Sequence, residues 1–346
     1  MKDGVVLITG SCGRIGLNLV RKLDAQFQII GFELVKSFYA VADEELVPVD
    51  LTSEESVSQA FSHIKDTYGN QIVAVVHLAA YYSFEKKHSP LYEKVTVAGT
   101  ERLLRHLQNF EVGQFIFSST MLVYAPCTPG HPMTEESPIA PKWDYPLSKV
   151  RTEQKIHELR GQTKTVILRI AGIYDDHCHS IPVSRQIQRI YENQLESRVF
   201  SGDIHHGSSF LHMDDLVDAI ALVIQKRDEL QAEEIFLLGE PKTLSYDAMQ
   251  RIISRQIRGT EFKTWRIPKW LAKIGAAILG ILPFSKPFIK PWMIDFADDH
   301  YELDISKAKN VLGWEPTRSL EATLPIIIKE LKKNPAGWYK TNQLSG

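Results

Sequence analysis

Two side chains in the middle of the chain have the spacing needed for proton transfer. Tyr145 and Lys149 are four residues apart, so on a helix they lie on the same face. A free phenol titrates near ~10, and a neighbouring ammonium group stabilises the phenolate and lowers this pKa. Such a tyrosine can exchange a proton with a hydroxyl or carbonyl group while a hydride moves to or from a nicotinamide. The same spacing is common on exposed helix faces, so the pair predicts chemistry only together with other signals.

A third polar group is expected from the segment before this pair. Residues 115–117 form an apolar run of strand type, and three hydroxyl residues, Ser118, Ser119 and Thr120, follow it directly. A strand that ends in this way can present a hydroxyl group to a substrate oxygen beside the tyrosine. We therefore expect the proton-transfer site at the end of this strand.

A glycine-rich turn near the N-terminus predicts a dinucleotide site. Residues 9–16 read Thr-Gly-Ser-Cys-Gly-Arg-Ile-Gly, directly after a β-branched run and at the start of a helical pattern. Gly10 permits a tight turn, Gly13 lets the backbone approach a pyrophosphate, and Gly16 allows the helix to pack closely on the strand. Glycines also mark ordinary turns, but here the strand, turn and helix occur in the required order.

An acidic residue at the end of the second strand indicates which dinucleotide binds. Glu33 follows the turn at about the expected ~20-residue distance and can accept hydrogen bonds from both ribose hydroxyls, whereas it would repel a 2′-phosphate. NAD is therefore favoured over NADP, although Arg14 could serve a phosphate. Besides Tyr145 and Lys149, the residues that we expect to bind the cofactor are Gly10, Cys12, Gly13, Arg14, Ile15, Gly16, Glu33, Asp50, Leu51, Leu78, Ala79 and Ala80.

These groups require an alternation of strands and helices to position them. Strands are expected at 4–9, 28–32, 46–49, 72–78, 114–118, 165–170 and 234–238, with helices at 17–23, 53–66, 95–108, 146–159 and 181–196 and another after Met213. Apolar strands alternating with helices predict an α/β fold, a Rossmann-type doubly wound parallel sheet, with a smaller C-terminal substrate lobe. We expect the dinucleotide-binding domain at 1–172 with 208–239 returning to it. The substrate lobe is then 173–207 and 240–346.

The composition excludes several classes of partner. The chain of 346 residues is 44% hydrophobic and has a formal net charge of −2, so no global field attracts nucleic acid or an anionic membrane. Cys12, Cys127 and Cys178 lack zinc-ligand spacing and predict no disulfide framework, which favours a reduced, cytoplasmic location. No signal peptide and no spanning segment is expected.

Taken in order, the motifs resemble the extended short-chain dehydrogenase/reductase family, in its NAD-dependent epimerase/dehydratase group. The resemblance covers almost the whole chain and rests on TGSCGRIG at 9–16, HLAA at 77–80, FIFSSTMLVY at 115–124, YPLSK at 145–149, LRIAGIY at 168–174, FLHMDD at 210–215 and LGWEP at 312–316. It implies that Tyr145 is the general acid/base, that Lys149 is its partner and that Thr120 hydrogen-bonds the substrate oxygen. It also implies a homodimer, packed through the helices around 95–108 and 146–159.

The chain departs from this family at positions that bear on the substrate. Members that dehydrate nucleotide sugars carry an Asp-Glu pair where this chain has Met121 and Leu122, so dehydration by that route is not expected. Arginines that grip a diphosphate in similar members are replaced by Ser208 and Phe296, and neither side chain can substitute for them. Arg185 and Arg189 on the helix at 181–196 are either substitutes for these arginines or part of a solvated helix face. A further difference, at Thr96 in place of an asparagine, puts a local hydrogen bond in doubt.

Two other segments invite functional hypotheses. The run 175–179 (Asp-Asp-His-Cys-His) suggests a metal, but adjacent residues seldom converge on one ion, so we expect a loop or a substrate contact and no metal site. The segment from Trp270 to Phe284 has one continuously apolar helical face. The favoured interpretation is a helix that packs in the core. The alternatives are a lid over a hydrophobic substrate or a surface that meets lipid or a partner.

The resulting hypothesis is an NAD(H)-dependent oxidoreductase that acts on a small-molecule secondary alcohol or ketone. A sugar epimerase with tightly held NAD is the alternative, and a non-catalytic dinucleotide sensor is a third possibility. A complete set of Thr120, Tyr145 and Lys149 argues against the sensor, because a sensor has no need of a proton relay. The missing diphosphate contacts predict that the substrate is not a standard nucleotide-diphosphate sugar.

Overall fold

A computed structural model describes residues 2–34, 45–83, 88–281 and 289–344 of the chain. Its centre is a parallel sheet of seven strands in the order β12-β8-β7-β5-β1-β2-β3, as the alternating pattern predicts. The strands are β1 (Val5–Thr9), β2 (Gln28–Glu33), β3 (Glu45–Pro48), β5 (Ala74–His77), β7 (Gln114–Thr120), β8 (Lys164–Ile170) and β12 (Glu233–Leu238). The predicted fold class is confirmed.

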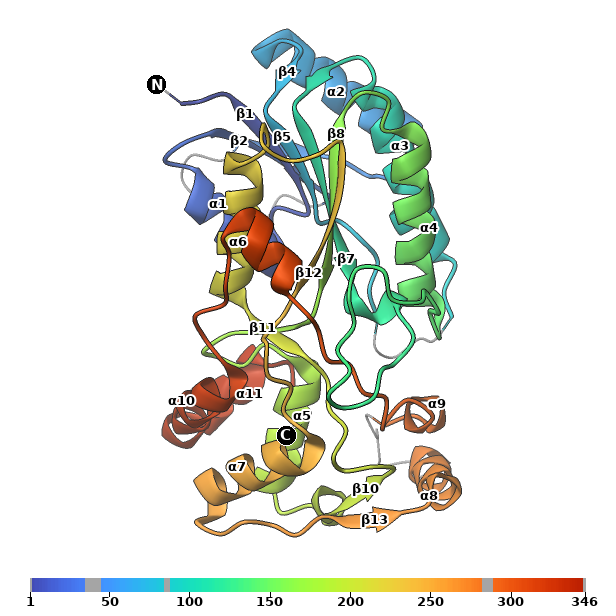
Figure 1. Ribbon diagram of the computed structural model, residues 1–346, viewed down its shortest axis with the longest axis vertical. Helices are drawn as coiled ribbons and strands as arrows, with labels where there is room; N and C mark the ends of the chain where they lie inside the picture. The colour runs from blue at the N-terminus through green and yellow to red at the C-terminus, as the bar shows by residue number, and fades with distance from the viewer. Residues whose placement is uncertain (1, 35–44, 84–87, 282–288, 345–346) are drawn as a thin grey trace.

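Helices cover both faces of this sheet (Figure 1). One face carries α1 (Arg14–Leu23) and α6 (Met213–Gln225), and the other carries α2 (Glu54–Tyr68), α3 (Ala98–Leu107) and α4 (Asp144–Leu159). Side chains that alternate along each strand feed two separate cores, because neighbouring residues of a strand point to opposite faces. Ser53 caps α2 by accepting a hydrogen bond from the Ser56 amide.

The expected helix over 95–108 begins earlier and has two parts. A π-helical turn, η1 (Tyr92–Val97), leads directly into α3. Short elements complete the region: β4 (Gln71–Ile72) pairs with β6 (Glu111–Val112), and a 3-10 turn, η2 (Met121–Val123), follows β7. This turn begins at Thr120, whose hydroxyl accepts a hydrogen bond from the Leu122 amide.

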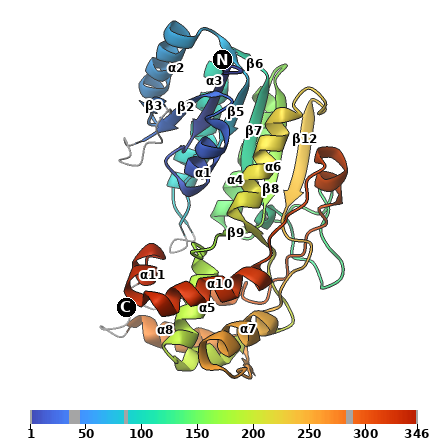
Figure 2. The same ribbon diagram turned by 90° about the vertical axis from the view of Figure 1, so that its left-hand side faces the viewer.

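A second group of helices lies beyond the carboxyl ends of the strands (Figures 1 and 2). A third core joins α5 (Ile181–Tyr191), α7 (Tyr246–Arg258), α10 (Leu320–Lys333) and α11 (Pro335–Thr341). The connecting strands pair as β9 (Gly172–Tyr174) with β11 (Phe210–His212) and as β10 (Val199–Ser201) with β13 (Trp265–Ile267). The remaining elements are η3 (Leu195–Arg198), α8 (Lys269–Ile281), α9 (Pro291–Ile294) and η4 (Ala308–Leu312).

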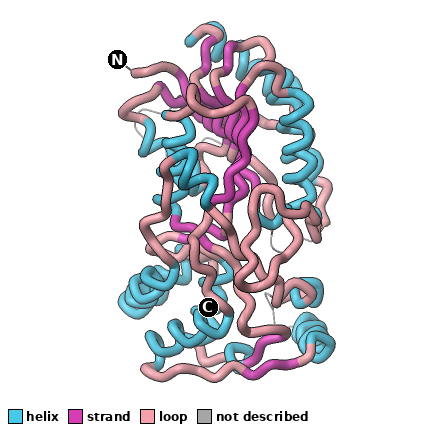
Figure 3. Tube along the Cα trace, viewed as in Figure 1, coloured by secondary structure: helices cyan, strands magenta, loops and turns pink. Residues whose placement is uncertain are grey.

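The C-terminal third does not pack as one block. Residues between Tyr301 and Trp314 join the core formed by α1 and α6, whereas α10 and α11 join the third core. Figure 3 shows the contrast between the strand-rich half of the molecule and this helical half, which loops connect. The loops between the two halves therefore lie at the carboxyl ends of the sheet strands, and the predicted site residues lie in the same region.

The favoured interpretation of the segment from Trp270 to Phe284 is wrong where the structure describes it. Trp270, Ile274 and Ile278 on α8 are 64%, 49% and 56% exposed, so this face is not packed in the core. Among the described side chains of α8, only Ala276, on the opposite side of the helix, is buried. A helix with one apolar face can still leave that face unburied when the elements that it contacts, here α9, meet a different face. Residues 282–284 of the segment lie outside the described part.

None of the helices in the described part of the chain combines the length and the apolar character needed to cross a membrane.

Candidate active site

The predicted cofactor residues lie at the carboxyl ends of four neighbouring strands. Gly10 follows β1, Glu33 ends β2, Asp50 lies just beyond β3, and Leu78 follows β5. The chain runs from β1 to β2 and β3 in one direction, and β5, β7, β8 and β12 extend in the other. The sheet therefore reverses its order beside β1, and open parallel sheets bind ligands outside the carboxyl ends at such a point.

The glycine-rich turn has no room for a side chain at Gly10 or Gly16. Gly10 has φ of 72°, and a Cβ there would lie 3.0 Å from the Ala79 nitrogen. A Cβ at Gly16 would lie 2.5 Å from the Ser11 carbonyl oxygen and still closer to that of Gly10. The turn and the first residues of α1 are thus packed backbone against backbone, which only glycine allows.

The start of α1 fits a bound pyrophosphate. Gly13 is the N-cap of α1, is exposed and provides no side-chain cap to the helix. The amides of the first helical turn therefore keep their capacity to donate to an anion, and the helix dipole favours negative charge there. Since Gly13 has no side chain, a phosphate can approach this backbone directly.

Glu33 is held in the position that ribose recognition requires. Its Oε2 accepts from the Cys12 amide at 3.2 Å, and its Oε1 accepts from the Leu34 amide at 2.9 Å. These bonds keep a carboxylate beside the glycine-rich turn, where it fits the two ribose hydroxyls of NAD and opposes a 2′-phosphate. The Arg14 guanidinium points elsewhere and donates to the His179 carbonyl at 3.1 Å.

The other predicted cofactor residues form the walls of this region. Asp50 Oδ1 accepts from the amide and the hydroxyl of Thr52, so it also shapes its own turn. Of the apolar residues, Leu51 is buried, Ile15 and Leu78 pack against the first core, Ala79 packs against the second, and Ala80 is half-buried. Together with the helix N-terminus and Glu33, these residues fit NAD.

A buried histidine that sequence reasoning left without a role anchors this edge of the sheet. His77 Nδ1 lies 2.6 Å from Thr9 Oγ1, and His77 Nε2 lies 2.7 Å from Thr100 Oγ1. Thr100 Oγ1 donates to the Thr96 carbonyl, so it accepts from Nε2–H, and Nδ1 accepts from Thr9. Burial, and then the nearby charge of Lys149, lower the pKa of His77 to about 3, so the ring is neutral. The sequence feature that could have indicated this role is the position of His77 at the end of an apolar strand.

Thr96, which stands in place of the family's asparagine, makes a hydrogen bond of its own. Its Oγ1 accepts from the Tyr81 amide at 3.0 Å. This threonine hydroxyl thus fixes the loop after β5 to the helix of the next crossover.

The structure brings the three predicted catalytic residues together. Thr120 ends β7, and Tyr145 lies in the first turn of α4, where the Thr120 hydroxyl acts to lower the pKa of the phenol. One turn later, Lys149 is 3% exposed, and its ammonium group donates to the Ser118 carbonyl at 2.6 Å. The same ammonium lies 4.6 Å from the centroid of the Phe117 ring. The tyrosine side chain remains partly accessible, as a group that meets substrate must be.

The expected lowering of the phenol pKa is not found. Burial raises the pKa of Tyr145 to about 12, with a further increase from Tyr92, and the hydrogen bond from Thr120 opposes this only in part. Lys149 lies 6.0 Å from the centre of the tyrosine ring. Burial lowers its own pKa to about 7, against the favourable charge of Glu153. A buried ammonium therefore does not compensate the desolvation of the phenol.

The loop of residues 175–179 is organised by its own contacts. His179 Nδ1 lies 2.5 Å from Asp175 Oδ2, and both lie in a turn closed by backbone hydrogen bonds between Asp175 and Cys178. Cys178 and His179 have positive φ angles of 86° and 42°. Within the described ranges, no three His, Cys, Asp or Glu side chains converge as metal ligands would.

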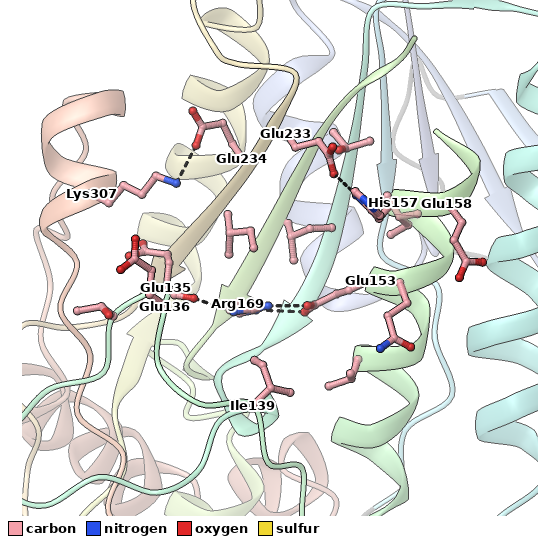
Figure 4. Close-up of a pocket in the computed structure, with 17 residues that line it drawn as sticks. Glu135, Glu136, Ile139, Glu153, His157, Glu158, Arg169, Glu233, Glu234 and Lys307 are labelled. Atoms are coloured by element: carbon pink, nitrogen blue, oxygen red, sulfur yellow. Dashed lines mark hydrogen bonds and ion pairs between the residues drawn. The ribbon is translucent and has the colours of Figure 1, made fainter. Parts of the chain in front are cut away.

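A wide groove elsewhere on the molecule is not the candidate active site (Figure 4). It measures about 1110 Å³ and lies over β8 and β12 beside α4. Its floor contains the buried ion pair of Arg169 with Glu153, and its rim is rich in carboxylates. None of the predicted catalytic or cofactor residues lines it. Its ion pair supports the site indirectly, because Glu153 also accepts from Ser119.

Comparisons with known proteins agree with this geometry. The family model described as the NAD dependent epimerase/dehydratase family matches residues 6–239. The chain is 27% identical to a UDP-glucose 4-epimerase of Vibrio cholerae over 325 residues, which cover 91% of this chain and 92% of the relative. It is 24% identical to 3 beta-hydroxysteroid dehydrogenase type 7 of Mus musculus over 351 residues, 92% of each.

Solved structures show the same fold. A UDP-glucose 4-epimerase of Thermotoga maritima with UDP-glucose superimposes with a TM-score of 0.71 at 22% identity, covering 96% of this chain and 99% of the other. A UDP-glucose 4-epimerase of Thermus thermophilus in complex with NAD gives a TM-score of 0.70 at 20% identity, covering 95% and 99%.

Proposed function

Because this chain belongs to the NAD-dependent epimerase/dehydratase family, whose model matches residues 6–239, we propose that it oxidises a secondary alcohol, or reduces the ketone, through Thr120, Tyr145 and Lys149. It is an NAD-dependent enzyme of the extended short-chain dehydrogenase/reductase type. The observation that carries the proposal is that Thr120 and Tyr145 come together beside the buried ammonium of Lys149, which donates to the Ser118 carbonyl. We also propose that the helical half around the third core holds the substrate.

In this mechanism two hydroxyl groups hold the substrate oxygen. Thr120 is close enough to Tyr145 to influence the pKa of its phenol, so an alcohol or carbonyl oxygen can bind to both hydroxyl groups. Tyr145 remains protonated at neutral pH because its pKa is about 12, so it donates a proton to the ketone oxygen when the reaction runs towards the alcohol. When the reaction runs from the alcohol to the ketone, Tyr145 must accept the proton of the alcohol hydroxyl.

Oxidation of the alcohol requires a positive charge near the Tyr145 phenol, because such a charge stabilises the phenolate that accepts the proton. Lys149 provides one such charge when protonated, and Glu153 favours that form. When bound, NAD supplies the hydride acceptor or donor, and its oxidised ring carries a positive charge that lowers the pKa of a neighbouring phenol. Gly10, Gly13 and Glu33 are the residues that would hold it.

The test replaces Tyr145 with phenylalanine. The variant should fold and bind NAD with nearly unchanged affinity, measured by calorimetry, and should lose two or more orders of magnitude in turnover, an order-of-magnitude expectation for one acid/base group. Tyr68→Phe, on α2, is the matched control and should keep full turnover. Near-normal turnover by Tyr145→Phe would contradict the proposal.

A second candidate is a sugar epimerase with tightly held NAD. The similarity to UDP-glucose 4-epimerases at 27% and 22% identity favours it. An epimerase returns the hydride to the same carbon, so it should retain NAD through purification, whereas a dehydrogenase should exchange it. The NAD content of the purified protein, measured after denaturation, separates the two.

Assembly and location are further parts of the proposal. A homodimer through α3 and α4 would join charged faces, because Glu101 and Arg105 form an exposed pair on α3, and Lys155 pairs with Glu158 on α4. Such a dimer should weaken with added salt, which sedimentation at low and high ionic strength tests. The free cysteines support a cytoplasmic location.

A further inference from the structure

A row of aromatic rings leads away from the proposed catalytic tyrosine. Tyr82 lies edge-on to Tyr145 with ring centroids 4.7 Å apart, and the centroid of the Trp143 ring lies 5.5 Å from that of Tyr145. The row continues from Trp143 to Trp292 at 5.6 Å and from Trp292 to Phe296 at 6.2 Å. Tyr82 is 45% exposed, and the two tryptophans and Phe296 are half-buried, so this aromatic row forms an accessible surface.

The row is assembled from three parts of the chain. Tyr82 lies in the loop after β5, Trp143 caps α4, and Trp292 and Phe296 belong to α9 and the turn after it. Rings from separate elements seldom stay half-exposed in contact unless something apolar covers them, since their burial is favourable. The row begins at the residue that would touch the reacting oxygen, so a substrate is the natural occupant.

Three of the positive charges beside this row are held in ion pairs. Each of these lysines pairs with an aspartate carboxylate close to α9: Lys142 with Asp299, Lys269 with Asp298 and Lys273 with Asp295. Lys290, at the start of α9, is a further cation of this region. Lys142 lies 2.7 Å from its partner and 5.5 Å from the centre of the Phe296 ring. A diphosphate needs cations that are not already paired. The charges of these three lysines are therefore not available to a phosphate, whereas the exposed rings of the row can make apolar contacts.

Arg185 and Arg189 on α5 are two further cations of this half. The guanidinium of Arg185 donates to Gln188 Oε1 at 3.1 Å, within its own helix. Arg189 lies one turn further along and is half-buried. If these arginines bind a diphosphate, a nucleotide sugar such as UDP-glucose will bind to the protein.

The neighbouring helix extends the apolar surface. Lys269 and Lys273 form the line of α8 that meets the segment around α9, and Trp270, Ile274 and Ile278 form the adjacent line. These three residues are 49% to 64% exposed. The exposed apolar face of α8 thus lies next to the side of the helix that contacts α9. The apolar surface of this region therefore extends beyond Phe296 onto α8.

We propose that the substrate is an uncharged lipophilic secondary alcohol, or its ketone, whose hydrocarbon body packs along the aromatic row. This inference rests on the proposed function, since it places the reacting oxygen between Thr120 and Tyr145. The hydrocarbon then extends over Trp143 and Trp292 towards Phe296. Apolar rings gain both hydrophobic burial and ring-to-ring contact on such a surface.

The test measures binding separately from turnover. Dehydroepiandrosterone and cyclododecanol serve as lipophilic probes and UDP-glucose as the charged one, each titrated by calorimetry into the full chain with NADH present. Both lipophilic probes should bind, and UDP-glucose should not. Trp292→Ala should weaken their binding by about tenfold or more, because it removes a ring from the row. Trp265→Ala, an equally large exposed residue on β13, is the matched control and should change nothing.

A second variant keeps the test decisive if Trp292→Ala does not fold. Phe296→Arg places a cation at the end of the row and should weaken the lipophilic probes. Failure of both lipophilic probes to bind, or tighter binding of UDP-glucose than of either, would overturn the inference. If UDP-glucose is also turned over, the proposed function stands while the inference fails. Lipophilic binding without NADH formation from NAD would count against the proposed function and, with it, against the bound alcohol being a substrate.

Discussion

Lys149 offers a sharp test of the proposed site, because its burial is expected to lower the free energy of unfolding of the protein. The side chain is 3% exposed, and burial lowers the pKa of its ammonium group from 10.5 to about 7. Between these values the unfolded chain holds a proton that the folded chain has released, so the stability of the wild type should rise with pH in this window. Below about pH 7 both states are protonated, and the full penalty remains.

The size of this penalty follows from the shift. Each unit of pKa difference is worth about 1.4 kcal/mol, so the burial of Lys149 costs about 4 kcal/mol near pH 7 and about 2 kcal/mol near pH 9. Lys149→Met removes the titrating group but leaves the Ser118 carbonyl without its donor, which costs about 1–3 kcal/mol. We expect the variant to be more stable than the wild type near neutral pH, and its advantage to shrink by about 2 kcal/mol towards pH 9.

Urea unfolding of both proteins, followed by far-ultraviolet circular dichroism at several pH values, measures this difference. The control is Lys155→Met, on the same helix, where the lysine lies at the surface and pairs with Glu158. Its effect should be small and should lack the pH dependence between about 7 and about 9. A difference between Lys149→Met and the wild type that stays constant over this range would refute the reasoning. A stabilised but inactive variant would show that Lys149 is retained for function.

Three further predictions concern the cofactor turn and the relay. Glu33→Ala should narrow the preference for NAD(H) over NADP(H), because it removes the carboxylate that opposes a 2′-phosphate; calorimetry showing that the wild type prefers NADP(H) would contradict the assignment. Gly16→Ala should cost about 1–3 kcal/mol of unfolding free energy as well as NAD affinity, because its Cβ would meet the Ser11 carbonyl at 2.5 Å, whereas Gly13→Ala should mainly lose NAD affinity. If urea unfolding shows that Gly16→Ala and Gly13→Ala lose the same unfolding free energy, this difference between the two positions is contradicted. Thr120→Val should lower turnover and leave NAD binding intact, and unchanged turnover would remove Thr120 from the relay.

The amino-acid sequence by itself determined the parallel sheet and the cofactor turn. Both depend on local patterns: an apolar run, glycines at fixed spacing, and Glu33 at the end of the next strand. The structure places these residues at adjacent carboxyl ends because parallel βαβ crossovers leave few other arrangements. The i and i+4 spacing of Tyr145 and Lys149 is equally local, so one helix brings them together without help from distant contacts.

The pKa values of these residues were decided by tertiary structure. A tyrosine and a lysine one turn apart predict a lowered phenol pKa, yet burial raises it to about 12 and lowers that of the lysine. Desolvation depends on what surrounds a group in three dimensions, which no spacing along the chain records. For the same reason, the neutral state of His77, bridged between Thr9 and Thr100, was not foreseen.

Tertiary structure also decided what the apolar helix α8 does. Its periodic face predicts burial, but Trp270 and Ile274 remain exposed because α8 meets the segment around α9 through its lysines. A hydrophobic pattern specifies that a face is apolar, and only the packing of distant segments determines what covers it. The aromatic row has the same origin, since Tyr82, Trp143 and Trp292 are far apart in the chain and meet only in the folded protein.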